Sequence, residues 1–154
     1  MNEADFRLQI VELTRAIAGR SLDSDLQDWL NDEYGAHSEG FRHLRDTCHR
    51  GVADGWLCQH EAGGIRYGRV FKPADDLHRY SVDVVEMNDV VGPHHSHPNG
   101  EIDLVMPSEG DARFDGHGAG WVVYPPGSAH HPTVTAGRAL VLYLLPEGSI
   151  EFTR

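Results

Sequence analysis

Apolar residues recur at helical spacing at the start of the chain. They fall three or four positions apart before Gly19, at Phe6, Ile10, Leu13 and Ile17. This spacing places the four side chains on one face of an α-helix, and glycine is typical of a helix end. An apolar stripe of this kind is typical of a helix that packs on a protein core. We therefore predict an N-terminal helix that ends near Gly19.

Two further helices are predicted before residue 56. Ser24 or Asp25 is the expected N-cap of the second helix, and Ser38 is that of the third, which we expect to end at Gly55. Their apolar faces comprise Leu26, Trp29 and Leu30 in one helix and Phe41, Leu44, Cys48 and Val52 in the other. These stripes are most simply explained by packing on a core.

From Trp56 onward the hydrophobic period changes to that of short strands. Strands are predicted over residues 65–71, 80–87, 102–106, 112–114, 121–124 and 139–145. Turn-forming Gly, Pro, Asn and Asp residues separate them, as in the sequences 62–64, 88–89, 115–116 and 125–127. Many short strands with turns between them are typical of a β-sandwich or a small barrel.

The change of period divides the chain into two parts. We predict a helical N-terminal part, residues 1–55, packed on a β-barrel, residues 56–154. The fold class is therefore α+β and mainly β. A chain of 154 residues is long enough for one core, so both parts belong to a single folded unit.

Charge and composition exclude several classes of partner. The formal net charge of −11 would repel nucleic acid and anionic membranes. The first five residues are acidic and lack the basic and apolar stretches of a signal peptide. No apolar run approaches the length of a membrane span. We therefore expect a cytoplasmic protein that binds neither nucleic acid nor membranes.

Histidines gather in the second half of the chain, which contains most of the candidate chemistry. His95 and His97 stand two positions apart, so on a strand both side chains point to the same face. The turn at residues 98–100 would return Glu101 beside them, and His130 follows a Pro-Pro-Gly turn at the start of another strand. Three imidazoles and one carboxylate suit a catalytic divalent metal ion with open coordination positions.

The donor set does not identify the metal, because Mn, Fe, Zn, Co and Ni all accept histidine and carboxylate. Two neighbouring histidines, His94 and His131, have the opposite strand parity and are expected outside the ligand set. His131 remains a candidate contact for a substrate or for a metal ligand.

These two segments resemble the motifs of the cupin superfamily. The first motif is matched by His95, Ser96, His97, three intervening residues and Glu101. The second, Pro-x-Gly-x-x-His, is matched by residues 125–130. The resemblance covers about residues 56–152 and implies a single cupin-type β-barrel, or jelly roll.

The first motif departs from the cupin pattern in its glycines. Its closing glycine is Gly110, two residues later than expected from Glu101, and six residues separate Gly110 from Asp103. Either Glu101 or Asp103 is therefore the carboxylate ligand. The two acids share one strand face, so an acid that does not bind the ion is a candidate general base.

The opposite face of this strand is apolar and needs cover. It carries Ile102, Leu104 and Met106. The N-terminal helices or a second subunit would provide that cover, and we expect a homodimer or a higher homo-oligomer.

A substrate site is indicated by arginine and tyrosine in the first predicted strand. Arg66 and Arg69 have opposite parity, so only one should face inward, where it could grip a carboxylate. Tyr67 shares a face with Arg69, and this pair could hold an aromatic acid. Tyr124 is a further candidate for the lining of the cavity.

The chain also resembles the small family that includes 4-hydroxylaminobenzoate lyase. The stretches that carry this resemblance are residues 63–70, 81–85, 87–95, 110–118 and 142–152. The resemblance implies a metal-dependent lyase of nitrobenzoate degradation, which converts the hydroxylaminobenzoate and water to protocatechuate and ammonia. That conversion needs no oxidant, and the chain has no Gly-rich dinucleotide signature.

The resemblance implies roles for the candidate residues. The ion on His95, His97, Glu101 and His130 would polarise the hydroxylamino oxygen, Asp103 or Glu101 would transfer protons, and an arginine would hold the benzoate carboxylate. The same ligands also suit a non-haem cupin dioxygenase acting on an aromatic or small acid, which would stop without oxygen. A non-catalytic cupin that binds small acids is the third hypothesis, and it would bind without forming product.

Overall fold

Helices come first and strands follow, as the hydrophobic period predicts. The structure is a computed structural model that describes residues 2–153. The helices are α1 (Glu3–Ile17), α2 (Ser24–Tyr34) and α3 (Glu39–Asp54), and a 3-10 turn, η1, spans Asp75–Leu77. The strands are β1 (His60–Ala62), β2 (Ile65–Phe71), β3 (Tyr80–Val91), β4 (His95–His97), β5 (Glu101–Phe114), β6 (Gly120–Tyr124), β7 (Ser128–His130), β8 (Thr133–Pro146) and β9 (Glu151–Phe152).

The helix ends follow from local hydrogen bonding. Ser38 caps α3 by accepting a hydrogen bond from the Phe41 amide, and Gly55 ends that helix in the left-handed region at φ 85°, as predicted. The predicted cap of α2 is wrong, because neither Ser24 nor Asp25 performs this role. Asp23 does so, since its carboxylate accepts from the amide of Leu26 three positions later.

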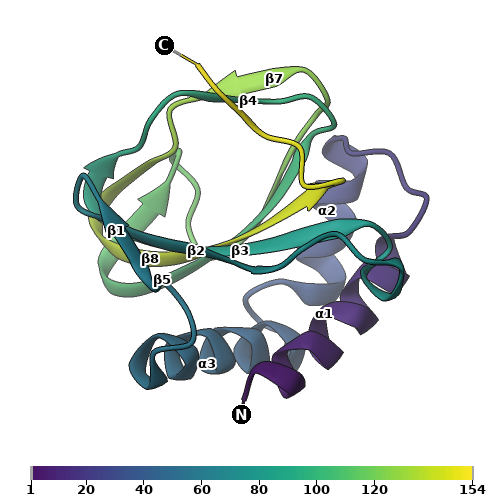
Figure 1. The fold of residues 1–154 in the computed structure, drawn as a ribbon, viewed down its shortest axis with the longest axis horizontal. Coiled ribbons are helices and arrows are strands. Elements are labelled where there is room, and N and C mark those ends of the chain that lie inside the picture. The colour runs from purple at the N-terminus through teal and green to yellow at the C-terminus, as the bar shows by residue number, and fades with distance from the viewer. Residues whose placement is uncertain (1, 154) are drawn as a thin grey trace.

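The strands form two antiparallel sheets. One has the order β1-β2-β3-β8-β5-β6, and the other has the order β7-β4-β9. The second sheet lies across from the first, and together they enclose an interior in the manner of a jelly roll (Figure 1). The mainly β fold with a helical N-terminal part is confirmed. The predicted barrel is two facing sheets rather than one closed sheet.

One strand is longer than predicted. The expected strands at residues 102–106 and 112–114 are parts of a single strand, β5, which pairs with β8 along its length. The register shifts on either side of Glu109, and Gly110 has a φ of +70°. A Cβ at Gly110 would lie 2.6 Å from the Ala136 carbonyl oxygen. The segment that separates the two predicted strands in the sequence is therefore a bulge within one strand.

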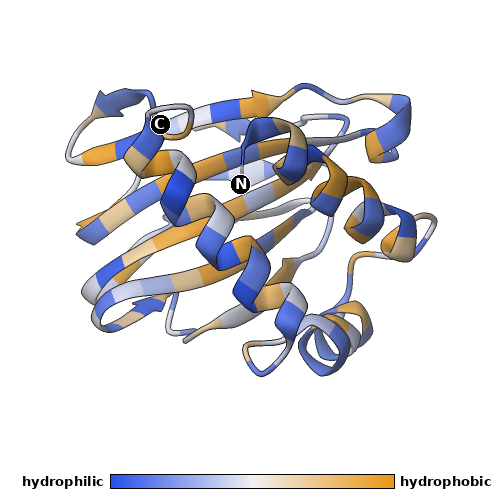
Figure 2. Ribbon diagram, turned by 90° about the horizontal axis from the view of Figure 1, so that it is seen from below, coloured by the Kyte–Doolittle hydropathy of each residue, from blue (hydrophilic) through white to orange (hydrophobic). Residues whose placement is uncertain are grey.

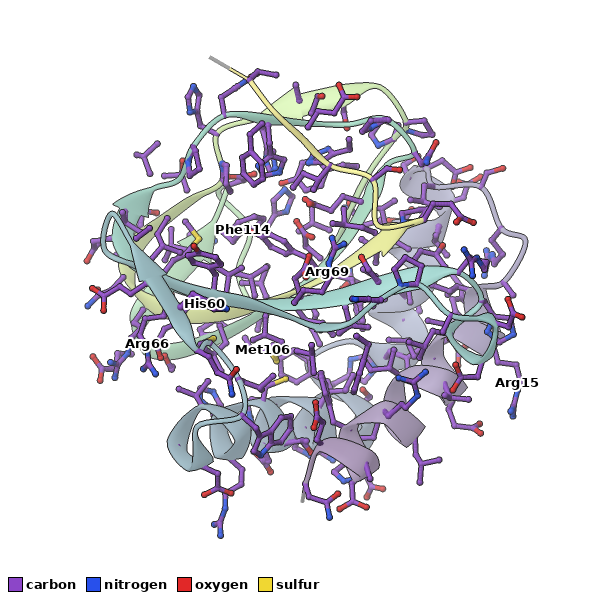
Figure 3. The ribbon with its side chains drawn as sticks, in the orientation of Figure 1. Arg15, His60, Arg66, Arg69, Met106 and Phe114 are labelled. Atoms are coloured by element: carbon purple, nitrogen blue, oxygen red, sulfur yellow. The ribbon has the colours of Figure 1, made fainter. Side chains whose placement is uncertain are left out.

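The helices cover the outer face of the six-stranded sheet (Figure 2). Ile102, Leu104 and Met106 are buried in the core between this face and the helices, while Val105 belongs to a second core on the inner face. Figure 3 shows Met106 on the helical side of the sheet. The predicted apolar face is thus covered by the chain's own helices.

Side chains of α2 bind the backbone of the edge strand β6. Asn31 donates to the Trp121 carbonyl oxygen at 2.9 Å and accepts from the Trp121 amide at 2.7 Å. Gln27 accepts from the Val123 amide at 2.9 Å. These bonds satisfy groups that an edge strand leaves unpaired.

Among the helices of residues 2–153, none is long and apolar enough to span a bilayer.

Candidate metal centre

Three imidazoles and one carboxylate converge in the interior. The ligand atoms of His95, His97, Glu101 and His130 all lie within 4.8 Å of one another. His95, His97 and Glu101 are almost completely buried, and the His130 side chain is 13% exposed. This is the set of donors that the sequence motifs predict, and Glu101 rather than Asp103 provides the carboxylate of the cluster.

Strand pairing explains how distant residues meet at this point. β4 pairs with β7 so that His95 lies opposite His130, and their Nε2 atoms are 3.1 Å apart. His97 is two residues further along β4 and shares the inward face. Glu101 opens β5 after the turn, so its carboxylate comes from the six-stranded sheet while the three imidazoles come from the smaller one.

The turn between β4 and β5 depends on Gly100. Its φ is +88°, and a Cβ there would lie 2.7 Å from a Leu22 methyl carbon and 2.8 Å from the Tyr124 carbonyl oxygen. A larger residue would therefore meet both strain and backbone contact. The chain needs this close approach to bring Glu101 back beside His95 and His97.

The hydrogen-bonding state of the donors fits a metal ion. Glu101 Oε2 lies 3.2 Å from His97 Nε2 and 3.6 Å from His130 Nε2, yet neither carboxylate oxygen has a hydrogen-bond partner among the described residues. His97 Nε2 also lacks one. Buried polar atoms without partners cost free energy. A cation at their point of convergence would satisfy them together.

The outer nitrogens of two imidazoles are held by hydrogen bonds. Ser128 donates its hydroxyl to the Pro125 carbonyl oxygen at 2.6 Å, so His97 Nδ1, 2.9 Å from Ser128 Oγ, is the donor in that contact. His130 Nδ1 lies 2.6 Å from a carboxylate oxygen of Asp115. In both rings the proton on Nδ1 leaves the Nε2 lone pair for a metal ion.

The two acids of β5 differ in their electrostatic surroundings. Burial opposes ionisation of Glu101, but contacts with the three imidazoles hold its pKa well below the ordinary value. Burial, and then the charge of Glu101, raises the pKa of Asp103 well above the ordinary value. Both oxygens of Asp103 are buried without a hydrogen-bond partner among the described residues.

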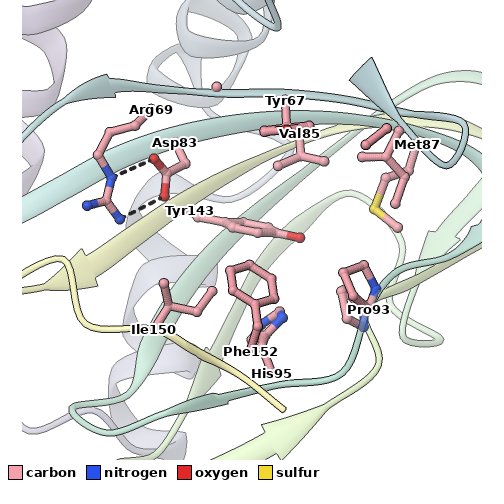
Figure 4. Close-up of a pocket in the computed structure, with 14 residues that line it drawn as sticks. Tyr67, Arg69, Asp83, Val85, Met87, Pro93, His95, Tyr143, Ile150 and Phe152 are labelled. Carbon is pink, nitrogen blue, oxygen red and sulfur yellow. Dashed lines mark hydrogen bonds and ion pairs between the residues drawn. The ribbon is translucent and has the colours of Figure 1, made fainter. Parts of the chain in front are cut away.

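A cavity of about 490 Å³ adjoins the cluster at His95. Its walls are mainly apolar, and they include Tyr143, Val85, Met87 and Phe152. Figure 4 shows Tyr143 extending between Arg69 and Asp83 on one side and Met87 and Pro93 on the other. A cavity of this size and character is suited to a small aromatic ligand.

The structure distinguishes between the two candidate arginines. Arg69 lines the cavity with Tyr67, whereas Arg66 does not line it and pairs with Glu86 at 3.3 Å (Figure 3). Arg69 forms a forked contact with Asp83, at 2.9 Å from Nε and 3.3 Å from Nη2. Its Nη2 also donates to the Gly148 carbonyl oxygen at 3.3 Å, and its Nη1 lies on the Gly148 side.

Other predicted contacts lie elsewhere. Tyr124 packs on His97 and His130 at ring distances of 5.4 and 4.5 Å, and it does not line the cavity. His131 is exposed, packs on His94 in a tilted arrangement with ring centroids 4.8 Å apart, and also lies outside the cavity lining. Asp103 lies beside Glu101 on the inner face but is separate from the cavity wall.

Sequence reasoning missed the residues that hold the donors in place. Asp115 was predicted only as part of a turn, and Ser128 and Asp83 were not singled out. The one available signal is that a metal-binding histidine needs a partner for its outer nitrogen. That rule does not say which of the chain's many acids and hydroxyls comes near, because strand pairing decides it.

Comparison with known proteins identifies the family. The family model described as PnbB, 4-hydroxylaminobenzoate lyase, matches residues 8–152. A 4-hydroxylaminobenzoate lyase of Nocardioides sp. (strain LMS-CY) is 35% identical over 145 residues, which cover 88% of this chain and 86% of the relative. One of Pseudomonas putida is 29% identical over 170 residues, with 99% and 97% covered.

Solved structures with similar folds include cupins. An RmlC-like cupin protein of Ralstonia eutropha JMP134 is 14% identical, with a TM-score of 0.45 and 60% of this chain and 62% of the other covered. The polyketide cyclase RemF of Streptomyces resistomycificus is 14% identical with the same TM-score, with 60% and 73% covered. The sequence relatives therefore define the family, and the chain belongs to the 4-hydroxylaminobenzoate lyases.

Proposed function

We propose that this protein converts 4-hydroxylaminobenzoate and water to protocatechuate (3,4-dihydroxybenzoate) and ammonia, with the help of one divalent transition metal ion. The observation that carries the proposal is the buried cluster of His95, His97, Glu101 and His130 at the wall of an apolar cavity. Membership in the lyase family supplies the substrate and the reaction class.

The reaction balances without an external oxidant. The substrate loses its C–N and N–O bonds, and the ring gains one hydroxyl at the carbon that carried nitrogen and another beside it. One water supplies the additional oxygen, and the nitrogen leaves as ammonia. The nitrogen is reduced as the ring is oxidised, so the catalyst has to handle protons and polarise a bond rather than deliver electrons.

The metal ion would be held by the three Nε2 atoms and the Glu101 carboxylate. When bound, it would supply Lewis acidity toward the hydroxylamino oxygen. Four protein ligands leave coordination positions open in the geometries that Mn, Fe, Co and Ni adopt. The metal's identity is left to measurement.

The cavity would orient the substrate by its two ends. The aromatic ring would lie against Tyr143 and Phe152, and the carboxylate would meet the Arg69 guanidinium, which lines the cavity. Asp83 binds this guanidinium by its forked contact and fixes its plane. The hydroxylamino end would then lie toward His95, and the apolar walls would exclude bulk water from the reacting atoms.

Proton transfer falls to the acids of β5. Glu101 faces the imidazoles, and Asp103 lies two positions further on the same face with no hydrogen-bond partner among the described residues. We assign Glu101 to the ion and Asp103 to proton exchange with the reacting groups through Tyr143, its cross-strand neighbour, which lines the cavity. We further propose a cytoplasmic homo-oligomer that acts in 4-nitrobenzoate degradation.

The proposal is tested by strictly anaerobic incubation with 4-hydroxylaminobenzoate. Ammonia and protocatechuate are measured over time, and metal content is measured on the same sample. We expect equal amounts of the two products without oxygen, loss of turnover after chelation, and recovery when metal is restored. A requirement for oxygen would indicate a dioxygenase, and ligand binding without product would indicate a binding protein.

Two histidine variants provide a matched comparison. His97→Ala removes a donor of the cluster, whereas His94→Ala removes an imidazole one position outside it. We expect the first to lose bound metal and turnover and the second to retain both. Undiminished turnover in metal-free protein would overturn the proposed role of the ion.

A further inference from the structure

Asp115 stands at a point where three strand ends meet. It forms a two-residue turn with Gly116 between β5 and β6, and both residues have positive φ, at 49° and 84°. Asp-Gly and Asn-Gly are the preferred sequences for such turns. The turn explains the residue type on its own, but it does not explain where the carboxylate points.

The Asp115 carboxylate is held by groups from three other segments. Its Oδ1 accepts a hydrogen bond from the Thr133 amide at 2.9 Å. Its Oδ2 accepts from the Tyr124 hydroxyl at 2.5 Å and lies 2.6 Å from His130 Nδ1. With Thr133 and Tyr124 fixing both oxygens, the carboxylate has one orientation, and its remaining contact is the outer nitrogen of His130.

His130 needs this support more than the other two imidazoles do. Its side chain is 13% exposed, compared with 2% for His95 and 0% for His97. It also lies on β7, an edge strand of its sheet, whereas β4, which carries the other two imidazoles, lies between β7 and β9. Packing therefore restrains the His130 ring less than the rings of His95 and His97. The hydrogen bond to the fixed Asp115 carboxylate restrains it instead.

We propose that Asp115 is a positioning residue for the metal centre. By accepting a hydrogen bond from His130 Nδ1, it fixes the ring so that the Nε2 lone pair faces Glu101 and the other donors. The Tyr124 hydroxyl holds Asp115 in turn. This inference rests on the proposed metal-binding function, and it adds a residue that neither the motifs nor the family description assigns.

The test is the affinity of the metal-stripped, full-length protein for Zn²⁺, measured by competition with a chromogenic chelator. Asp115→Asn keeps a favourable turn sequence, but it has one acceptor oxygen where the carboxylate uses two, for the Thr133 amide and for His130 Nδ1. We expect it to weaken Zn²⁺ binding about 10- to 100-fold, as loss of a carboxylate partner of a metal-binding histidine does. Asp111→Asn, at an exposed position on β5, should leave the affinity unchanged.

A double-mutant cycle separates positioning from a general structural effect. If Asp115 acts through His130, Asp115→Asn should change the Zn²⁺ affinity of a His130→Ala protein by less than about threefold, because the residue it orients is absent. Co²⁺ absorption spectra of the single variant should also differ from the wild type in their d–d bands, because the position of the His130 nitrogen changes.

The outcomes distinguish this inference from the proposed function. Equal loss of affinity in the wild-type and His130→Ala backgrounds, or no loss in either, would overturn the positioning role while the metal centre stands. Failure of the wild type to bind either Zn²⁺ or Co²⁺ would overturn the metal centre itself and the inference with it.

Discussion

At the scale of single residues, a row of polar side chains crosses the inner face of the large sheet. Arg69, Asp83, Tyr143 and Asp103 are successive cross-strand neighbours on β2, β3, β8 and β5. Arg69 and Asp83 form an ion pair, whereas Asp103 at the other end of the row has no basic side chain paired with it among the described residues. The row therefore joins the cavity to the acids of the candidate metal centre, and the proposed function assigns substrate binding to one end and proton transfer to the other.

The first prediction concerns substrate binding by Arg69. Replacing Arg69 alone would leave Asp83 unpaired, so the test is the double variant Arg69→Met/Asp83→Asn, which keeps the cavity neutral. Loss of a charge-assisted contact to the benzoate carboxylate should raise KM about 10- to 100-fold with a smaller change in kcat. Arg66→Met, on the opposite face, is the control, and an equal rise in KM there would refute the assignment.

Asp103 gives the second prediction. Asp103→Asn is nearly isosteric and removes the exchangeable acid next to Glu101. If Asp103 transfers protons, kcat should fall about 100-fold or more while metal content stays at the wild-type level. Steady-state kinetics and metal analysis on one preparation test this. Retained kcat would assign proton transfer to another group, and lost metal would assign Asp103 to the ligand set.

At the scale of elements, helix α2 closes the edge of the six-stranded sheet. Asn31 and Gln27 bind backbone groups of β6 at Trp121 and Val123, so this edge cannot pair with another strand. β6 in turn leads to Tyr124 and the turn before β7, where His130 lies. The N-terminal helices therefore support the strand segments that carry the metal centre, although no helix provides a ligand of the cluster.

The third prediction tests this edge contact. Asn31→Ala removes two hydrogen bonds and leaves part-buried backbone groups of Trp121 without partners. We expect the free energy of unfolding to fall by about 2 kcal/mol. Urea denaturation measures this, with Asp32→Ala on the exposed side of α2 as the control. Equal stability of the two variants would show that the contact contributes nothing.

At the scale of the whole molecule, the candidate metal centre draws its residues from both sheets. The imidazoles of His95, His97 and His130 come from the β7-β4-β9 sheet, and the Glu101 carboxylate comes from the six-stranded sheet. An ion shared by these donors would hold the sheets together on the side opposite the helices. Metal binding should therefore contribute to stability as well as to catalysis.

The fourth prediction follows from this arrangement. Metal at 100 times its dissociation constant should stabilise the fold by about 2.7 kcal/mol. For a chain of this size that corresponds to a rise in Tm of about 5–10 °C. Thermal unfolding with and without metal measures the rise, and Glu101→Gln should reduce it. An unchanged rise in that variant would mean that the ion does not bridge the sheets through Glu101.

Features that depend on local periodicity follow from the amino-acid sequence alone. Helical and strand spacing located the helices and most strands, and strand parity placed His95 and His97 on one face and His94 outside the cluster. Parity also placed the apolar residues of β5 on the covered face. Motif spacing alone left Glu101 and Asp103 as alternative ligands, because a shifted glycine can mark either a bulge or a shift in the motif.

Contacts between residues far apart in the sequence follow from the three-dimensional fold. Pairing between β4 and β7 places His130 against His95, and the β5–β6 turn directs Asp115 at His130. The fold also turns Arg69 rather than Arg66 toward the cavity. The physical reason is that these contacts depend on strand register and sheet curvature, which arise from packing over the whole chain and leave no periodic trace in the sequence.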